Sequence, residues 1–245
     1  MLKIIFLGMF LMGTCGCAAP PLGWWNPNFG DAAVEIQNLY VNKPDIIINL
    51  TAFDGNNQLL VDMGQIVSRV VSDTIISQFE ERGFTITNSK VSNEKFYKNP
   101  YLYLTAGELQ DRYYAIVADA NSRRITTSNE SYNYLLGSNA RRLSAATSSD
   151  AFILVCGRGF LKSKGEKSRE VVRNAAVTVA TIGLGTKQVH SSSGVLHMSL
   201  IDGKTGAVLW HSHSSSAQHH DLTDLAKVRE LIQQMIRPFP YIKSR

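Results

Sequence analysis

Apolar and polar positions in the first half of the chain follow two alternating periods, one typical of strands and one typical of helices. Asp45–Phe53 is rich in β-branched and apolar residues and predicts a strand. In Asp62–Arg82 the apolar residues recur every third or fourth position, which predicts a helix that Gly83 ends. Phe84–Thr87 predicts a second strand, so this part of the chain reads as strand, helix, strand.

The second half predicts a central strand, a hairpin and a C-terminal helix. Ala151–Leu161 is apolar on both faces, as expected of a strand inside a sheet. Val195–Ile201 and Ala207–His213 predict the two strands of a hairpin, joined by the glycine-containing loop Asp202–Gly206. The apolar residues of Asp221–Arg237 have helical spacing.

The middle of the chain gives weaker patterns. Tyr101–Ala106 fits either a strand or the start of a helix, Tyr113–Ala118 predicts a strand, and Ser131–Ala146 predicts a helix. All these elements together predict an α/β (α+β) fold in which helices pack on a mixed β-sheet in a single compact domain.

The N-terminus carries an export signal. Met1–Lys3 is a short positive segment, Ile4–Met12 is apolar, and small residues follow up to Cys17. This ending resembles the lipobox of bacterial lipoproteins, in which the cysteine thiol is lipidated and the signal peptide is cleaved before it. The resemblance implies lipidation of Cys17, with Cys15 as the alternative position and a soluble secreted protein as the alternative class.

The lipobox resemblance sets the expected domain organisation: a signal peptide at residues 1–16, a lipid-anchored tether at 17–30 and the envelope domain at 31–245. It implies a bacterial cell-envelope protein held to the membrane by its lipid, and Ala18 favours the periplasmic side of the outer membrane. Proline, glycine and asparagine in the tether disfavour regular structure. Trp24 and Trp25 either lie at the membrane interface or pack on the domain.

Composition agrees with a folded exported domain and disfavours several function classes. Hydrophobic residues make up 44% and charged residues 18%, which is typical of globular proteins. The net charge of +5 comes from scattered basic residues with no nucleic-acid-binding motif, so no nucleic-acid partner is expected. Cleavage before a lipidated Cys17 leaves only Cys156 inside the folded domain, which excludes an internal disulfide and predicts a small buried side chain rather than a nucleophile.

Enzyme motifs fail on inspection. Gly157–Gly159 lacks the third glycine of a dinucleotide-binding fingerprint, and Gly203–Thr205 follows Met198 where a phosphate-binding loop needs glycine. No serine-nucleophile elbow and no zinc-protease motif occurs in the sequence. We therefore expect neither an enzyme nor a cofactor.

Three phrases resemble a group of envelope lipoproteins: the helix of Val61–Gly83 leading into Phe84, the strand in Ser149–Gly159, and the hairpin Leu196–Trp210 with its Asp-x-x-Thr-Gly turn. The group contains the curli-secretion lipoprotein, the penicillin-binding-protein activator lipoprotein and flagellar outer-membrane lipoproteins. The resemblance covers roughly residues 45–237. It implies an α/β domain that activates, scaffolds or forms pores, and it places no functional residue on this chain.

Histidines form one candidate site. Five of the six histidines lie between positions 197 and 220. If the hairpin pairs Met198 with Trp210, His197 lies opposite His211, with His213 two residues along on the same face. These imidazoles could bind zinc or copper, with His219 or His220 added from the following loop. The alternative is a polar, solvent-facing side of the hairpin on which histidines meet by chance.

The segment Val171–Leu184 is apolar but too short to cross a membrane as a helix. It fits either a buried helix or a flap that enters the membrane when protomers assemble. We therefore expect a non-enzymatic adaptor or assembly factor that binds an unidentified envelope protein. The alternatives are an oligomeric secretion or pore subunit, which would make the chain a homo-oligomer, and a histidine-rich metal-binding protein.

Overall fold

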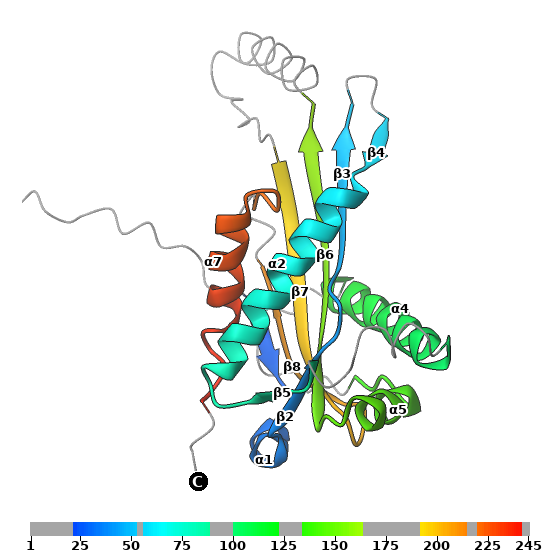
Figure 1. Ribbon diagram of the computed structural model, residues 1–245, viewed down its shortest axis with the longest axis vertical. Helices are drawn as coiled ribbons and strands as arrows, with labels where there is room; N and C mark the ends of the chain where they lie inside the picture. The colour runs from blue at the N-terminus through cyan, green and yellow to red at the C-terminus, as the bar shows by residue number, and fades with distance from the viewer. Residues whose placement is uncertain are drawn as a thin grey trace, which may run out of the picture.

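An eight-stranded mixed sheet lies at the centre of the molecule, with helices on both of its faces (Figure 1). The computed structural model describes residues 22–52, 56–88, 100–122, 134–163, 192–214 and 220–241. Cys17 and Val171–Leu184, two subjects of prediction, lie outside these ranges. Within them, none of the helices combines the length and the hydropathy needed to cross a lipid bilayer.

The strands are β1 (Leu22–Trp25), β2 (Asn38–Val41), β3 (Asp45–Thr51), β4 (Asn57–Leu59), β5 (Thr85–Ile86), β6 (Ala151–Lys162), β7 (Ser192–Asp202) and β8 (Val208–His213). The sheet runs β1-β8-β7-β6-β2-β5. β3 pairs with β6 further along that strand than β2 does, and β4 pairs with β3. β2 and β3 run parallel to β6, whereas β7, β8 and β1 alternate antiparallel.

The helices are α1 (Phe29–Glu35), α2 (Val61–Glu80), α4 (Pro100–Ser122), α5 (Ser138–Thr147) and α7 (Leu225–Ile236). Side chains of α2 and α7 share one buried cluster with one face of β6 and β7, for example Ile75 with Val155. Side chains of α4 and α5 share a second cluster with the opposite face, for example Leu109 with Leu154. Because neighbouring residues of a strand face opposite sides, the doubly apolar β6 needs both helical layers.

These elements confirm the predicted α/β class with a mixed sheet in a single compact domain. The strand predicted at Tyr113–Ala118 is wrong, because those residues belong to α4. Leu109, Tyr113 and Val117 are all buried and lie four residues apart, which is the spacing of a helix face. The aromatic and β-branched residues of this segment favour a strand. The segment is nevertheless helical, because a helix buries this stripe of side chains against the sheet.

The tether predicted at residues 17–30 is also too long. Leu22–Trp25 forms β1, an edge strand that pairs antiparallel with β8 and places Trp24 beside His211. Trp24 is 5% exposed, so of the two alternatives for this tryptophan, packing on the domain is the one observed. The part of the domain that the structure describes therefore begins at Leu22.

Hydrogen bonds and a glycine in the turn between β7 and β8 stabilise the hairpin. The Asp202 carboxylate accepts hydrogen bonds from the backbone N–H of Lys204 and from the N–H and hydroxyl of Thr205. Gly206 has φ of 78°, and a Cβ there would lie 2.8 Å from the carbonyl oxygen of Gly137. Only glycine fits both the left-handed backbone and this close approach.

Candidate metal centre

Three histidine side chains from the β7–β8 hairpin lie together on one face of the sheet. His197 comes from β7, and His211 and His213 come from β8. One potential ligand nitrogen from each ring lies within 4.8 Å of the other two. The sequence predicted this grouping, and the structure brings the three predicted residues together.

The register that produces the grouping differs from the predicted one. His197 pairs with His213 rather than with His211, and Leu200 pairs with Trp210. A β-bulge lies between Leu200 and Ile201, and this irregularity in the ladder was invisible in the sequence. The ladder is shifted by two residues. Because side chains alternate with a period of two, this shift keeps the same histidines on the same face.

The alternative of a solvent-facing histidine surface is wrong for this face. His197 is 5% and His211 3% exposed, and His213 is partly buried. Trp24 of β1 stacks against His211 with ring centroids 5.8 Å apart. Tyr113 of α4 meets the same imidazole edge-on at 6.5 Å. Residues of β1 and α4 thus cover His211 from two directions.

A short chain of hydrogen bonds orients one ring. Ser199 Oγ lies 2.8 Å from His211 Nδ1 and donates to the Tyr113 hydroxyl oxygen at 3.0 Å. If Nδ1 of His211 carries the ring proton and donates it to Ser199, the lone pair lies on Nε2, which is then the nitrogen able to bind an ion.

The other two rings have unsatisfied nitrogens. Nδ1 of His197 and Nδ1 of His213 are buried and lack a hydrogen-bond partner among the described residues. A buried polar atom without a partner costs on the order of 1–3 kcal/mol, so such atoms are uncommon in folded proteins. Two such atoms on neighbouring rings of one three-histidine cluster are the feature that needs an explanation.

All three imidazoles are held in the neutral form. Burial, followed by repulsion from the neighbouring His213, lowers the pKa of His197 to about 4. Burial, followed by the other two histidines, moves the pKa of His211 well below its usual range, and burial lowers the pKa of His213. Neutral imidazole is the form that binds a metal, so the three rings are ready to do so at neutral pH without losing protons.

The three ring centroids form an almost equilateral triangle. The centroid separations are 5.6 Å for His197 and His211, 5.5 Å for His197 and His213, and 5.7 Å for His211 and His213. The planes differ by 27°, 21° and 35° in the same order, so the rings are close to parallel. The three centroid separations thus differ from one another only slightly.

Other predicted participants lie outside this group. His219 is not among the described residues, and His220 is described but does not belong to the three-histidine cluster. Cys156 pairs with His197 across β6 and β7 and is a buried free thiol, as predicted. Burial, with a smaller effect from Asp45, raises the pKa of this thiol to about 12.

Sequence reasoning missed the residues around the histidines. Ser199 was detectable, because it lies two residues after His197 and so faces the same side of β7. Tyr113 was assigned to a strand, and Trp24 to a tether, so neither was expected here. Their roles depend on α4 crossing the sheet and on β1 pairing with β8, and both are long-range contacts.

Comparison with known proteins adds little. No family model matches the chain, and no curated protein matches it. Among solved structures, a crystal structure of a DUF4136 family protein from Bacteroides thetaiotaomicron is 10% identical, with 92% of this chain and 99% of that chain covered. Its TM-score is 0.35, which is too low to carry an argument about fold or function.

Proposed function

We propose that this protein binds a transition-metal ion of the zinc–copper group through His197, His211 and His213. The observation that carries the proposal is the enclosed triangle of neutral imidazoles with unsatisfied nitrogens. Imidazole nitrogen is a ligand suited to zinc and copper, and three histidines are a recognised donor set for them. A bound ion would give the two unpaired nitrogens the partner that the described protein atoms do not.

The surroundings support the same proposal. Metal-binding histidines usually donate their second ring N–H to a fixed acceptor, which sets the tautomer and the ring orientation. At His211 the neighbouring hydrogen-bond partner is the Ser199 hydroxyl, which is itself hydrogen-bonded to the Tyr113 hydroxyl. The histidine triangle is therefore held on two paired antiparallel strands, β7 and β8, and a helix packs beside it, which suits a preformed binding site.

The experiment is a titration of the purified, metal-stripped protein with zinc and with copper, followed by metal analysis of the dialysed complex. We expect one ion per chain. The double variant His197→Ala/His211→Ala should lose it. Ser212→Ala is the matched control, because Ser212 lies between His211 and His213 and is buried, with its hydroxyl bound to the Met235 carbonyl oxygen. Equal uptake by the wild type and the double variant would remove the proposal.

We also propose that this binding takes place in the bacterial cell envelope, on a lipid-anchored and non-enzymatic protein. The support is the N-terminal signal and the lipobox-like ending at Cys17, which the sequence alone supplies. The test is labelling of cells with radioactive palmitate. We expect the wild type to incorporate the label and the Cys17→Ser variant to lack it. Label that persists in this variant would move the lipid to Cys15 or elsewhere.

An adaptor that binds an envelope protein is a second candidate, and one surface feature favours it. Leu59 of β4 and Val61 and Ile66 of α2 are 54%, 54% and 45% exposed, and all three come from the β4–α2 corner. Exposed apolar side chains from one corner suit contact with another protein. A photo-crosslinking amino acid at Leu59 should capture one defined partner in cells, whereas the same probe at exposed Glu230 should not. The pore alternative depends on Val171–Leu184 and stays a prediction.

A further inference from the structure

The ring triangle of the candidate metal centre has the dimensions of a planar three-coordinate site. An ion about 2.0 Å from each nitrogen, with each ring centre about 1.15 Å further out, gives centroid separations of about 5.5 Å in a plane and about 5.1 Å on three corners of a tetrahedron. The observed separations are 5.5, 5.6 and 5.7 Å.

Closing the site needs only small ring movements. The candidate nitrogens lie within 4.8 Å of one another, whereas three nitrogens around one planar ion lie about 3.5 Å apart. Since the ring centres already have the required separations, rotation about the Cβ–Cγ bonds supplies most of the difference. The hairpin backbone can keep its register while this happens.

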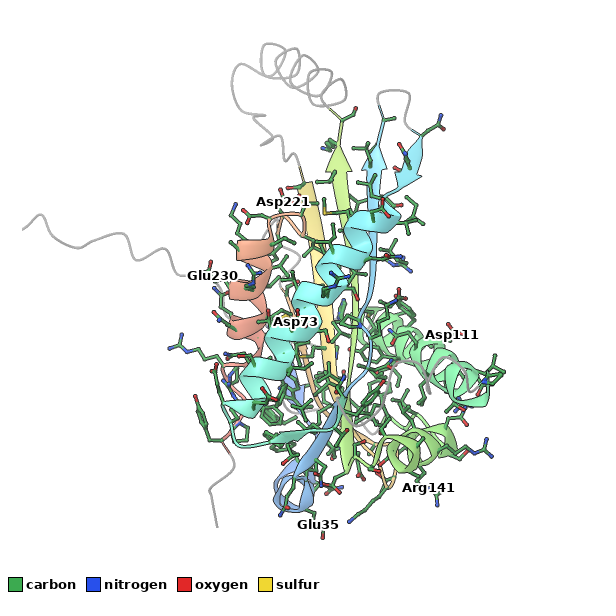
Figure 2. The ribbon with its side chains drawn as sticks, in the orientation of Figure 1. Glu35, Asp73, Asp111, Arg141, Asp221 and Glu230 are labelled. Carbon is green, nitrogen blue, oxygen red and sulfur yellow. The ribbon has the colours of Figure 1, made fainter. Side chains whose placement is uncertain are left out.

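The donor set carries no negative charge. The group of mutually close ligand atoms consists of the three imidazoles and contains no carboxylate and no thiolate from the described residues. Acidic side chains are found elsewhere: Asp111 and Glu230, for example, are exposed and project outward from α4 and α7 (Figure 2). An ion at the centre would therefore keep its full charge.

That absence of charge favours an ion of low charge. The cost of moving an ion from water into a low-dielectric site rises with the square of its charge, so a monovalent ion pays about a quarter of what a divalent ion of the same size pays. Structural zinc sites use four ligands, often with thiolates that neutralise the ion. Here the rings of Trp24 and Tyr113 border His211 and add no charged group to the site.

We infer that the His197–His211–His213 centre is selective for copper in its monovalent state, Cu(I), over Zn(II). The inference rests on the proposed function and deepens it. Cu(I) accepts three ligands in a plane, has a single charge and binds imidazole nitrogen. It enters as Cu(I), supplied already reduced, so no oxidation or reduction step is involved.

The test is a competition under anaerobic conditions. Protein carrying one Zn(II) is titrated with copper held as Cu(I) by ascorbate and a chromophoric Cu(I) chelator, and Ag(I) serves as a redox-inert monovalent probe. We expect Cu(I) to displace the zinc, with an affinity at least about a hundredfold higher. X-ray absorption of the copper complex should show three nitrogen neighbours and no sulfur.

Two variants sharpen the result. His213→Asp replaces a partly exposed imidazole with a carboxylate, which adds the missing negative charge and should shift the preference toward Zn(II) by at least about tenfold. Ser212→Ala, whose substitution lies on the other face of the same strand, should leave the preference unchanged.

The outcomes separate the two proposals. Zinc bound through the histidines and not displaced by Cu(I) would overturn the copper inference and leave the metal-binding function standing. A copper complex with four neighbours or with a sulfur neighbour would overturn it as well. Failure of the wild type to bind either metal, while Ser212→Ala and wild type share the same circular dichroism and melting curve, would end both proposals.

Discussion

Acidification should destabilise the metal-free protein through its buried histidines. In the unfolded chain His197 has its ordinary pKa of 6.5, and in the folded protein burial lowers it to about 4. The unfolded state therefore takes up a proton below pH 6.5 that the folded state refuses until about pH 4. The stability is fully present above pH 6.5 and falls as the pH drops through this window.

The size of the effect follows from the shift. Each unit of difference in pKa corresponds to about 1.4 kcal/mol, so His197 alone removes about 2 kcal/mol at pH 5 and about 3 kcal/mol at pH 4. The pKa values of His211 and His213 are also lowered, so they change the stability in the same direction. A loss of 2 kcal/mol is a large part of the stability of an ordinary domain.

Urea denaturation with a metal chelator present, at half-unit steps from pH 7.5 to pH 4.5, measures this directly. The unfolding midpoint should be level above pH 6.5 and fall steadily below it. His197→Asn removes one titrating ring and should flatten the slope by its share. A wild-type midpoint that stays constant between pH 7 and pH 5 would refute the reasoning, because the histidines would then titrate as they do in water.

Further predictions concern single side chains. Ser199→Ala should weaken metal binding about 10- to 100-fold in calorimetry while the fold is kept, because it removes the partner that orients His211. Asp150→Ala should lower the free energy of unfolding by about 2 kcal/mol in urea, because its carboxylate accepts hydrogen bonds from the backbone N–H groups that start β2. Gly206→Ala should cost about 2 kcal/mol through its left-handed backbone, whereas Gly30→Ala, with no atom near its added Cβ, should be neutral or slightly stabilising in the same melts.

The elements that the sequence predicted are those whose own residues carry the pattern. In α2 the buried Val67, Val71, Ile75 and Phe79 lie four residues apart, so the helix face is visible without knowing what covers it. The hairpin was visible for the same reason, since its strands alternate and its turn holds Asp202 and Gly206.

The elements that were missed depend on distant partners. β1 has only four residues, and it is a strand because it pairs with the edge of β8 about 190 residues later in the chain, where Leu22 pairs with His213. β2 is equally short and forms between β5 and β6. A few residues cannot show a period of their own, so local pattern carries no information about such strands.

The sequence predicted which histidines form the candidate site, but it did not predict the residues that surround them. The spacing of His211 and His213 put two imidazoles on one face, and any register shifted by an even number adds His197. Burial by α4 and β1, and the orientation of His211 through Ser199 and Tyr113, follow from tertiary packing. That enclosure turns a set of neighbouring histidines into a candidate binding site.

Anomalous diffraction from crystals of the protein loaded with copper, with data collected on both sides of the copper absorption edge, tests the central claim most directly. We predict one strong anomalous peak per chain, about 2.0 Å from one nitrogen each of His197, His211 and His213. No peak within the triangle, or a peak on other histidines while the three rings stay apart, would contradict the account.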